Sequence, residues 1–540
     1  MTSVIGEGRK EKPRIAVFSG PNATIANSPP LVTSNKARLP NERRIPGRYD
    51  HLVPQILYEP VTVKIKKYSA HPLEADSKEV YHDDGKEYYE VTLNPDDGPY
   101  LLPYMAKRKA DSSEKGIPFE AADLENPGIS FGGRQGFYPD ASRIFLDIDR
   151  TISGRSMNGE GSILDRKAEY DFIRALPPGG YTKGGEISGR DYFPYEPHAL
   201  NKSPRVRDLV RSVNSVQTAL NSGNYVGAIW LEGSPHVEET LYWLSLLVDT
   251  ELPITGNASQ RAHGRLANDG DRNIVDSVDY ILSGEGTGLG AVGIQDQQIF
   301  AAREFKKADD RPGNYKATGG HGGILGTIKA DVTIWYTPHY KHTSNSEVNL
   351  SQLNENVEFI TNAADSEMAS VRVKDEDGLL LGSCIPRVHI VKSAHYMQED
   401  QDEIPEQEAD IMAWIQKAQE DQSLPDEDRP KLHGLVLEGS SPYATGSRSQ
   451  GKALNLAALN GMPVVRVGRS DPGGKVPTNP SDLTIEGSNL DSNKARLLLI
   501  ASMLKLGRLP KASDPKNPTR AERDRIIEKI VDFQKIFETH

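Results

Sequence analysis

The sequence predicts an α/β protein built on parallel sheets, and three observations predict it. Short apolar runs such as residues 15–18 end in loops rich in Gly, Pro, Asn and Ser, as buried strands do. Segments with helical spacing of apolar residues lie between these runs. The chain has 540 residues, too many for one ordinary core, so at roughly 150 residues per domain we expect two to four units.

The first unit alternates strands with helices. We expect strands at residues 15–18, 225–231, 253–255 and 291–294, and helices at 237–247 and 273–282. This alternation is typical of a parallel sheet covered by helices on both faces.

A second α/β unit follows. We expect strands at 387–391, 434–437 and 463–467, a helix at 410–418 and an amphipathic helix from about residue 519. The predicted layout is an N-terminal domain at 1–345, a connecting segment at 346–385 and a C-terminal domain at 386–540.

Residues 70–195 differ from both units because Tyr, Pro, Gly and Asp are frequent and helical patterns are few. We interpret this region as an irregular, β-rich insertion in the first domain. Its glycine-rich segment at 151–161 could form a lid over a site or an ordered surface loop.

Composition excludes several classes of protein. The net charge of −12, with 64 Lys and Arg against 76 Asp and Glu, lacks the basic footprint of a nucleic-acid binder. No apolar run approaches the roughly 20 residues that span a membrane, and the polar start favours a cytoplasmic location. The single cysteine, Cys384, excludes an intramolecular disulfide, and its apolar surroundings predict a buried residue.

Several segments, in order, carry a resemblance to a known family. They are Ser-Gly-Pro-Asn-Ala-Thr-Ile-Ala at 19–26, the strand and Glu-Gly-Ser-Pro-His-Val-Glu-Glu-Thr at 227–240, Gly-Asn-Ala at 256–258, Asn-Asp-Gly-Asp-Arg-Asn at 268–273, Ile-Phe-Ala-Ala-Arg-Glu-Phe-Lys-Lys at 299–307, Lys-His-Thr-Ser at 341–344 and Asn-Lys-Ala-Arg at 493–496. Together they resemble the L-asparaginase/glutaminase family of threonine amidohydrolases.

This resemblance implies a larger N-terminal flavodoxin-like domain, a smaller C-terminal α/β domain and a homodimer or homotetramer. It also implies that a threonine hydroxyl attacks a side-chain amide to form an acyl-enzyme, which water then hydrolyses. Thr24 matches the nucleophile, Ser234 the second active-site threonine and Lys307 the catalytic lysine. No metal or organic cofactor is implied.

The residues themselves suit these roles. Thr24 follows a strand and a turn, where a hydroxyl could project among backbone N–H groups, although a helix N-cap has the same pattern. A lysine in a water-poor cleft can lose its proton and assist a hydroxyl, which fits Lys307, whereas we expect Lys306 to face solvent. By itself, a Lys-Lys pair is more typical of a solvated helix face.

Departures from the family pattern bear on the substrate. Pro235 stands where the family has the aspartate that binds the substrate's α-amino group, and proline offers neither a carboxylate nor an N–H. Glu232 replaces a histidine and His236 a threonine. We therefore expect a linear or cyclic amide other than plain asparagine. Two alternatives stay open: a different bond cleaved with Glu232 and His236, or a non-catalytic small-molecule binder.

The remaining candidate residues are less well determined. Tyr49 is a weak match for the family's loop tyrosine. The further candidates for substrate binding are Gly233, Asn257, Ser188, Arg190 and Asp191. Either residues 68–77 or residues 187–191 could stand at the family's carboxylate-binding loop. His71, Glu74 and Asp76 have a spacing that matches no defensible metal site, so no metal is predicted.

Overall fold

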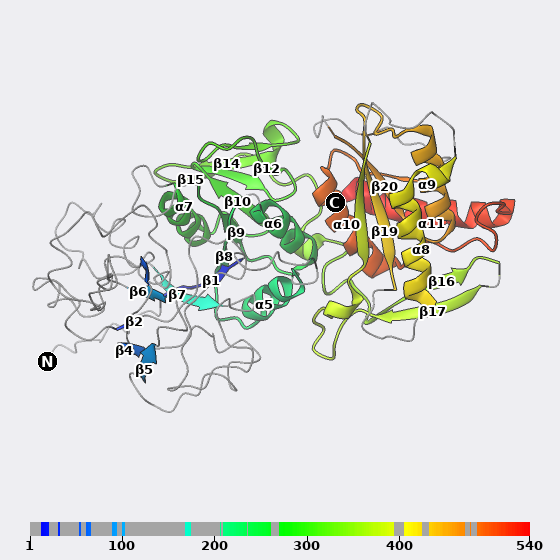
Figure 1. The fold of residues 1–540 in the computed structure, drawn as a ribbon. Coiled ribbons are helices and arrows are strands. Elements are labelled where there is room, and N and C mark those ends of the chain that lie inside the picture. The colour runs from blue at the N-terminus through cyan, green and yellow to red at the C-terminus, as the bar shows by residue number, and fades with distance from the viewer. Residues whose placement is uncertain are drawn as a thin grey trace, which may run out of the picture.

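The computed structural model describes residues 12–20, 168–173, 206, 209–234, 236–260, 269–364, 366–393, 404–423, 431–469, 476 and 483–540, and five short strands between residues 31 and 102. Figure 1 shows an N-terminal α/β half beside a C-terminal α/β half.

The N-terminal half is built on one eight-stranded sheet with the order β15-β14-β11-β10-β9-β8-β1-β7. Its parallel strands are β7 (Glu169–Ile173), β1 (Arg14–Ser19), β8 (Gly227–Leu231), β9 (Ile254–Asn257) and β10 (Ala291–Gln295). Antiparallel strands β11 (Gln298–Ala301), β14 (Ile324–Ile328) and β15 (Val332–Ile334) extend it at one edge. The strands predicted at 15–18, 225–231, 253–255 and 291–294 are confirmed.

Helices cover both faces of this sheet, because successive strand residues are apolar and point to opposite sides. Ala16 and Phe18 of β1 pack with α5 (Leu209–Asn221) and α6 (His236–Leu247). Ile15 and Val17 pack on the other side with α7 (Gly270–Ser283). The two predicted helices of this half are confirmed as α6 and α7.

Strand β7 lies within the range that we interpreted as an insertion, yet it belongs to the main sheet. It pairs in parallel with β1, with Ile15 opposite Tyr170 and Phe18 opposite Ile173. Across the sheet, the five parallel strands lie in the order β7, β1, β8, β9, β10. The second parallel strand of the chain therefore lies at the edge, beside the first. Sequence periodicity could not show this, because about 150 residues separate the two partners and strand pairing at such a distance leaves no local signal.

The C-terminal half contains a four-stranded parallel sheet of β18 (Arg387–Lys392), β19 (His433–Gly439), β20 (Val464–Gly468) and β21 (Ile485–Glu486). Its helices are α8 (Ala409–Ser423), α9 (Arg448–Leu459), α10 (Ser492–Leu506) and α11 (Arg520–Thr539). The strands and helices predicted for this half are confirmed. Thr519 caps α11, whose buried face includes Ile526, Ile530 and Phe533.

Smaller sheets complete the described chain. An antiparallel hairpin of β16 (Asn356–Asn362) and β17 (Glu367–Arg372) lies in the predicted connecting segment. Hairpin β12 (Phe305–Lys307) and β13 (Tyr315–Ala317) follows β11. The short strands β2 (Leu31–Val32), β4 (Val61–Ile65) and β5 (Tyr89–Leu93) form one sheet, and β3 (Val53–Gln55) and β6 (Tyr100–Leu102) another.

The two halves meet where α10 packs against both α6 and strands β18 to β20. Lys494 of α10 is buried and its ammonium donates to the carbonyl oxygens of Ala302, Arg303 and Phe305 at 2.7–3.0 Å. Cys384 is buried as predicted, and burial raises the pKa of its thiol to about 12. None of the described helices is long and apolar enough to cross a membrane.

Candidate active site

The candidate site lies at the carboxyl edge of the parallel sheet, where open α/β folds bind ligands. Backbone bonds tie the strand ends together: the amide of Gly20 donates to the carbonyl of Leu231 at 2.7 Å, and that of Glu232 to Asn257 at 3.1 Å. The loops after β1, β8 and β9 therefore start side by side. Thr24 follows β1 in the sequence and lies outside the described residues.

Glu232 occupies the base of this edge. Its carboxyl is buried and accepts a hydrogen bond from the indole N–H of Trp230 at 2.7 Å. Burial raises the pKa of Glu232 to about 8, against the opposing effect of its bonds to Thr240 and Trp230. The side chain is therefore mainly a neutral acid at pH 7.

Gly20 is required next to this acid. A Cβ at position 20 would lie 2.8 Å from the Cδ of Glu232 and 3.0 Å from the Cζ2 of Trp230. Since both neighbours are packed, a larger residue at position 20 would displace the backbone at the end of β1, a few residues before Thr24.

Lys307 lies on β12 directly opposite Tyr315 on β13. Its ammonium lies 4.8 Å from the centroid of the Tyr315 ring and donates to the carbonyl of Arg311 at 3.0 Å. Partial burial lowers the pKa of Lys307, and the carboxylates of Asp269 and other neighbours oppose this shift. The backbone N–H of Lys307 donates to Glu238 of α6 at 2.5 Å, so the strand is fixed to the helix that follows Ser234.

Tyr315 joins Lys307 to Ser234. Its ring stacks on Phe305 with centroids 4.4 Å apart, and its side chain is buried. Burial raises the pKa of the Tyr315 phenol, and the neighbouring Ser234 hydroxyl opposes the shift. Among the described residues, no partner forms a hydrogen bond of normal geometry with the Tyr315 hydroxyl. A buried hydroxyl without such a bond is costly to the fold and is a common feature of functional sites.

The structure corrects the expectation for Lys306. Its ammonium forms an ion pair with Asp491 at 2.8 Å rather than facing solvent freely. The pair lies on a strand, so the interpretation of Lys306 and Lys307 as a solvated helix face is also wrong. Asp491 caps α10 in the C-terminal half. Its ion pair with Lys306 and the hydrogen bond from Lys494 to the carbonyl of Phe305 fix the start of β12 to this helix.

The side-chain amide of Asn257 is hydrogen-bonded within the N-terminal half. It donates to the carbonyls of Asn273 and Ile294, both at 3.1 Å, and accepts from the hydroxyl of Ser277 at 3.0 Å. These bonds fix the end of β9 to α7 and β10. Asn257 therefore shapes the edge of the site, and both of its amide N–H groups are already used.

Glu232, Gly233, Ser234 and His236 lie in one short segment between β8 and α6, and the structure links Lys307 to Ser234 through Tyr315. Ser234 is half-buried after β8, and His236 is the first residue of α6. The remaining predicted site residues, Thr24, Tyr49, Pro235, Ser188, Arg190 and Asp191, lie outside the described residues, as do His71, Glu74 and Asp76. Within the described part of the chain, no group of three or more His, Cys, Asp or Glu could hold a metal ion.

Sequence reasoning missed Tyr315, Glu238 and the anchoring role of Lys494. The role of Tyr315 depends on a hairpin pairing, and that of Lys494 on a contact across about 190 residues. The only available signal was that Glu238 and Lys494 both lie in segments that resemble family motifs.

Ser234, Tyr315 and Lys307 thus lie together near the carboxyl end of β8, at the edge of a parallel sheet where open α/β folds bind small molecules. Residues 198–340 match the family described as Asparaginase, N-terminal. This segment contains β8 to β15, Ser234 and Lys307. This stretch of the chain is thus similar to the N-terminal domain of asparaginases.

Individual relatives match over part of their length. The glutaminase-asparaginase of Acinetobacter glutaminasificans is 28% identical over 148 residues, covering 27% of this chain and 44% of that protein. The L-asparaginase of Bacillus licheniformis is 31% identical over 156 residues, covering 27% of this chain and 47% of that protein. The chain thus spans less than half the length of these two curated relatives.

A solved structure also resembles the chain. It is the probable cytoplasmic L-asparaginase from Campylobacter jejuni, which is 17% identical with a TM-score of 0.45 over 69% of this chain and 92% of that one.

Proposed function

We propose that this protein is an amidohydrolase that cleaves a carbon–nitrogen amide bond through Thr24. The Thr24 hydroxyl adds to the amide carbonyl, the carbon–nitrogen bond breaks, and ammonia or an amine leaves with the proton that it gains. Water then hydrolyses the resulting ester and restores the hydroxyl. Metal and organic cofactors have no part in the proposed reaction.

The observation that carries the proposal is the grouping of Ser234, Tyr315 and Lys307. Ser234 follows β8, which pairs with β1, and β1 ends at Ser19, a few residues before Thr24. Lys307 and Tyr315 face each other on the β12–β13 hairpin, with Tyr315 next to Ser234. A hydroxyl nucleophile needs a group that takes its proton, and this edge supplies a lysine whose pKa is lowered by burial. The family match over residues 198–340 covers the same side chains.

Each neighbour has a distinct role in the proposal. Lys307 accepts the proton in its neutral form, and Ser234 orients the hydrolytic water. Tyr315 remains protonated because its pKa is raised, so its O–H can donate to Ser234 or to the developing oxyanion. Tyr49 remains a prediction for the loop that covers the site.

We propose that the substrate lacks the α-amino acid group of asparagine. Pro235 removes the aspartate that the family uses for the ammonium group, and the nearby Glu232 is buried and neutral rather than an exposed anion. A cationic ammonium would therefore meet no carboxylate at either position. Ser188, Arg190 and Asp191 remain candidates for binding another part of a linear or cyclic amide.

The layout and assembly belong to the same proposal. We infer a flavodoxin-like N-terminal domain at 1–345, a connecting segment at 346–385 and a C-terminal domain at 386–540. The strand order β7-β1-β8-β9-β10 supports the flavodoxin-like assignment. A homodimer or homotetramer and a cytoplasmic location remain predictions.

The two alternative functions receive less support. A different reaction driven by Glu232 needs an accessible carboxyl, but Glu232 is 4% exposed and bonded to Trp230. A non-catalytic binder would have no need for a buried Tyr315 hydroxyl without a good hydrogen bond.

Ammonia release by the purified protein tests the proposal. The panel contains asparagine, glutamine, carboxamides without an α-amino group, and small lactams and imides, with ring opening of the last two followed by chromatography. Turnover of a compound that lacks the amino group supports the proposal. Inactivity toward every member would contradict it.

A further inference from the structure

The end of α11 joins the C-terminal half of the chain to the N-terminal half. His540 caps this helix and is fully buried. Its backbone carbonyl accepts hydrogen bonds from Arg303 Nε at 2.6 Å and from the Tyr242 hydroxyl at 3.1 Å. The amide of Lys341 donates to the carbonyl of Thr539 at 2.9 Å. Three parts of the N-terminal half therefore hold this helix end, and the proposed reaction uses none of these contacts.

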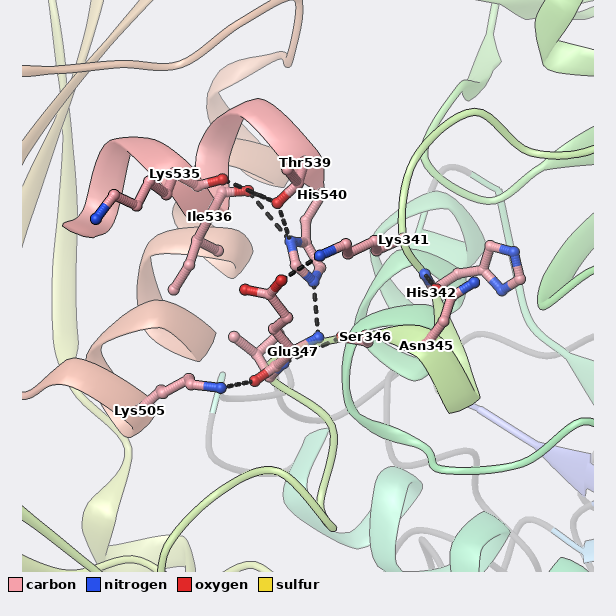
Figure 2. A network of polar contacts seen from close by, with 11 residues as sticks. Lys341, His342, Asn345, Ser346, Glu347, Lys505, Lys535, Ile536, Thr539 and His540 are labelled. Carbon is pink, nitrogen blue, oxygen red and sulfur yellow. Dashed lines mark hydrogen bonds and ion pairs between the residues drawn. The ribbon is translucent and has the colours of Figure 1, made fainter. Parts of the chain in front are cut away.

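The hydrogen bonds of the His540 imidazole fix it in one neutral form. Its Nε2 lies 2.9 Å from the backbone nitrogen of Glu347, which can only donate, so Nε2 is the acceptor. Its Nδ1 lies 3.2 Å from the carbonyl oxygen of Ile536, which can only accept, so Nδ1 carries the hydrogen. Figure 2 shows the ring joining α11 to the segment that carries Glu347. A proton added at Nε2 would point at the Glu347 N–H, and this bond would be lost.

The surroundings of the ring oppose a second proton. The ammonium of Lys341 pairs with the Glu347 carboxylate, and the ammonium of Lys505 on α10 donates to the Glu347 carbonyl (Figure 2). Burial lowers the pKa of His540 to about 4, and the two ammonium groups act in the same direction. The Ile536 carbonyl and the Glu347 carboxylate oppose the shift without cancelling it. The imidazole is therefore neutral at pH 7.

The rest of α11 is held by contacts that do not titrate. Phe533, Ile536 and Phe537 are buried in the apolar core of the C-terminal half. His342 is the other buried imidazole in the neighbouring segment, and burial lowers its pKa, but Figure 2 shows its ring pointing away from these contacts. Protonation of His540 therefore acts on the end of the helix and leaves the body of the helix in place.

We propose that the end of α11 is an acid-released latch, in which protonation of His540 breaks its bond to the Glu347 amide and frees the helix end from the segment 341–347. A histidine whose pKa is lowered in the closed state stabilises that state fully above its ordinary pKa of 6.5, and this stabilisation is lost as the pH falls from 6.5 towards about 4. Each pH unit in this window raises the equilibrium constant for opening about tenfold. The inference is independent of the proposed amide hydrolysis.

Residue-resolved hydrogen exchange of the full chain tests the latch. The helix end protects the amides of Glu347 and Lys341, whereas the Leu350 amide donates to Leu247 of α6 at 2.8 Å and is the internal control. Protection factors correct for the intrinsic pH dependence of exchange. We expect those of Glu347 and Lys341 to fall about 30-fold between pH 7.5 and pH 5, and that of Leu350 to stay the same. Unchanged protection of Glu347, or an equal fall at Leu350, would overturn the proposal.

Two variants identify the group that titrates. His540→Gln keeps a side-chain oxygen that can accept from the Glu347 amide but takes up no proton, so we expect its protection factors to be equal at the two pH values. His342→Gln is the matched control, because it removes the neighbouring buried imidazole and leaves His540 in place. We expect it to show the parent's fall of about 30-fold.

A fall that persists in His540→Gln, or that His342→Gln removes, would assign the pH dependence to another group and would show that the proposal is wrong. If His540→Gln does not fold, the contrast between the Glu347 and Leu350 amides in the parent protein and in His342→Gln still decides between the two results.

Discussion

The ammonium of Lys307 lies 4.8 Å from the ring centroid of Tyr315, its directly opposite neighbour across the β12–β13 hairpin. This pairing places a phenol without a good hydrogen bond between the candidate catalytic lysine and Ser234. The ring and the hydroxyl of Tyr315 therefore have separable roles, one in packing and one in the site.

Tyr315→Phe separates them. The substitution keeps the stack on Phe305 and removes only the hydroxyl. We expect kcat to fall at least about tenfold because a positioned donor is lost. The melting temperature should stay the same or rise, because a buried hydroxyl without a good bond no longer has to be accommodated. Steady-state kinetics and thermal unfolding measure both effects, and a large loss of stability with unchanged kcat would assign the hydroxyl a structural role.

Glu232→Gln tests the neutral acid beneath the site. The pKa of Glu232 is raised to about 8, so the folded state holds its proton more tightly than the unfolded state does. The associated stability is fully present below about pH 4.5 and is lost as the pH rises through about 8. We expect urea unfolding to show a fall of a few kcal/mol for the parent across this window and a smaller fall for Glu232→Gln. Identical pH profiles would mean that Glu232 is not the buried acid described.

Lys494→Met tests the junction that holds β12. The ammonium of Lys494 donates to three backbone carbonyls, which would lose their donor without access to water. We expect the free energy of unfolding to fall by about 3–5 kcal/mol. Lys535→Met is the control, since Lys535 is exposed and, within the described part of the chain, its ammonium pairs with Asp532 on the same helix; it should change stability by less than about 1 kcal/mol. Equal denaturation midpoints for the two variants would refute the anchoring role.

Pro235→Asp restores the carboxylate that the family uses for the substrate ammonium. If the loss of this group redirects the substrate, asparagine hydrolysis should rise at least about tenfold in kcat/KM, because a carboxylate paired with an ammonium is worth more than 1 kcal/mol in a desolvated site. Pro235→Asn, which adds a polar group without the charge, is the control. An equal gain in kcat/KM for both variants would show that the missing negative charge does not determine the choice of substrate.

Much of the fold could be predicted from the sequence because its elements are defined locally. Short apolar runs and helical spacing of apolar residues identify these elements from nearby sequence alone. This holds for β1, β8, β9 and β10 and for the helices between them. The position of β7 beside β1 could not be predicted, since the pairing joins residues far apart in the chain.

The site shows the same division. Ser234 and Lys307 could be predicted because they lie in recognisable motifs. Tyr315 has no motif, and its place follows from a hairpin register and from stacking on Phe305. Lys306 was misjudged because its partner, Asp491, lies in the other half of the chain.

The central claim is that Thr24 is the nucleophile of an amide hydrolase, and the most direct measurement is ammonia release by Thr24→Ala and Thr24→Ser on an amide that the parent protein hydrolyses. We expect Thr24→Ala to lose turnover by at least about a thousandfold with an unchanged melting temperature, and Thr24→Ser, which keeps a hydroxyl, to retain part of it. Parent-like turnover by Thr24→Ala would contradict the account.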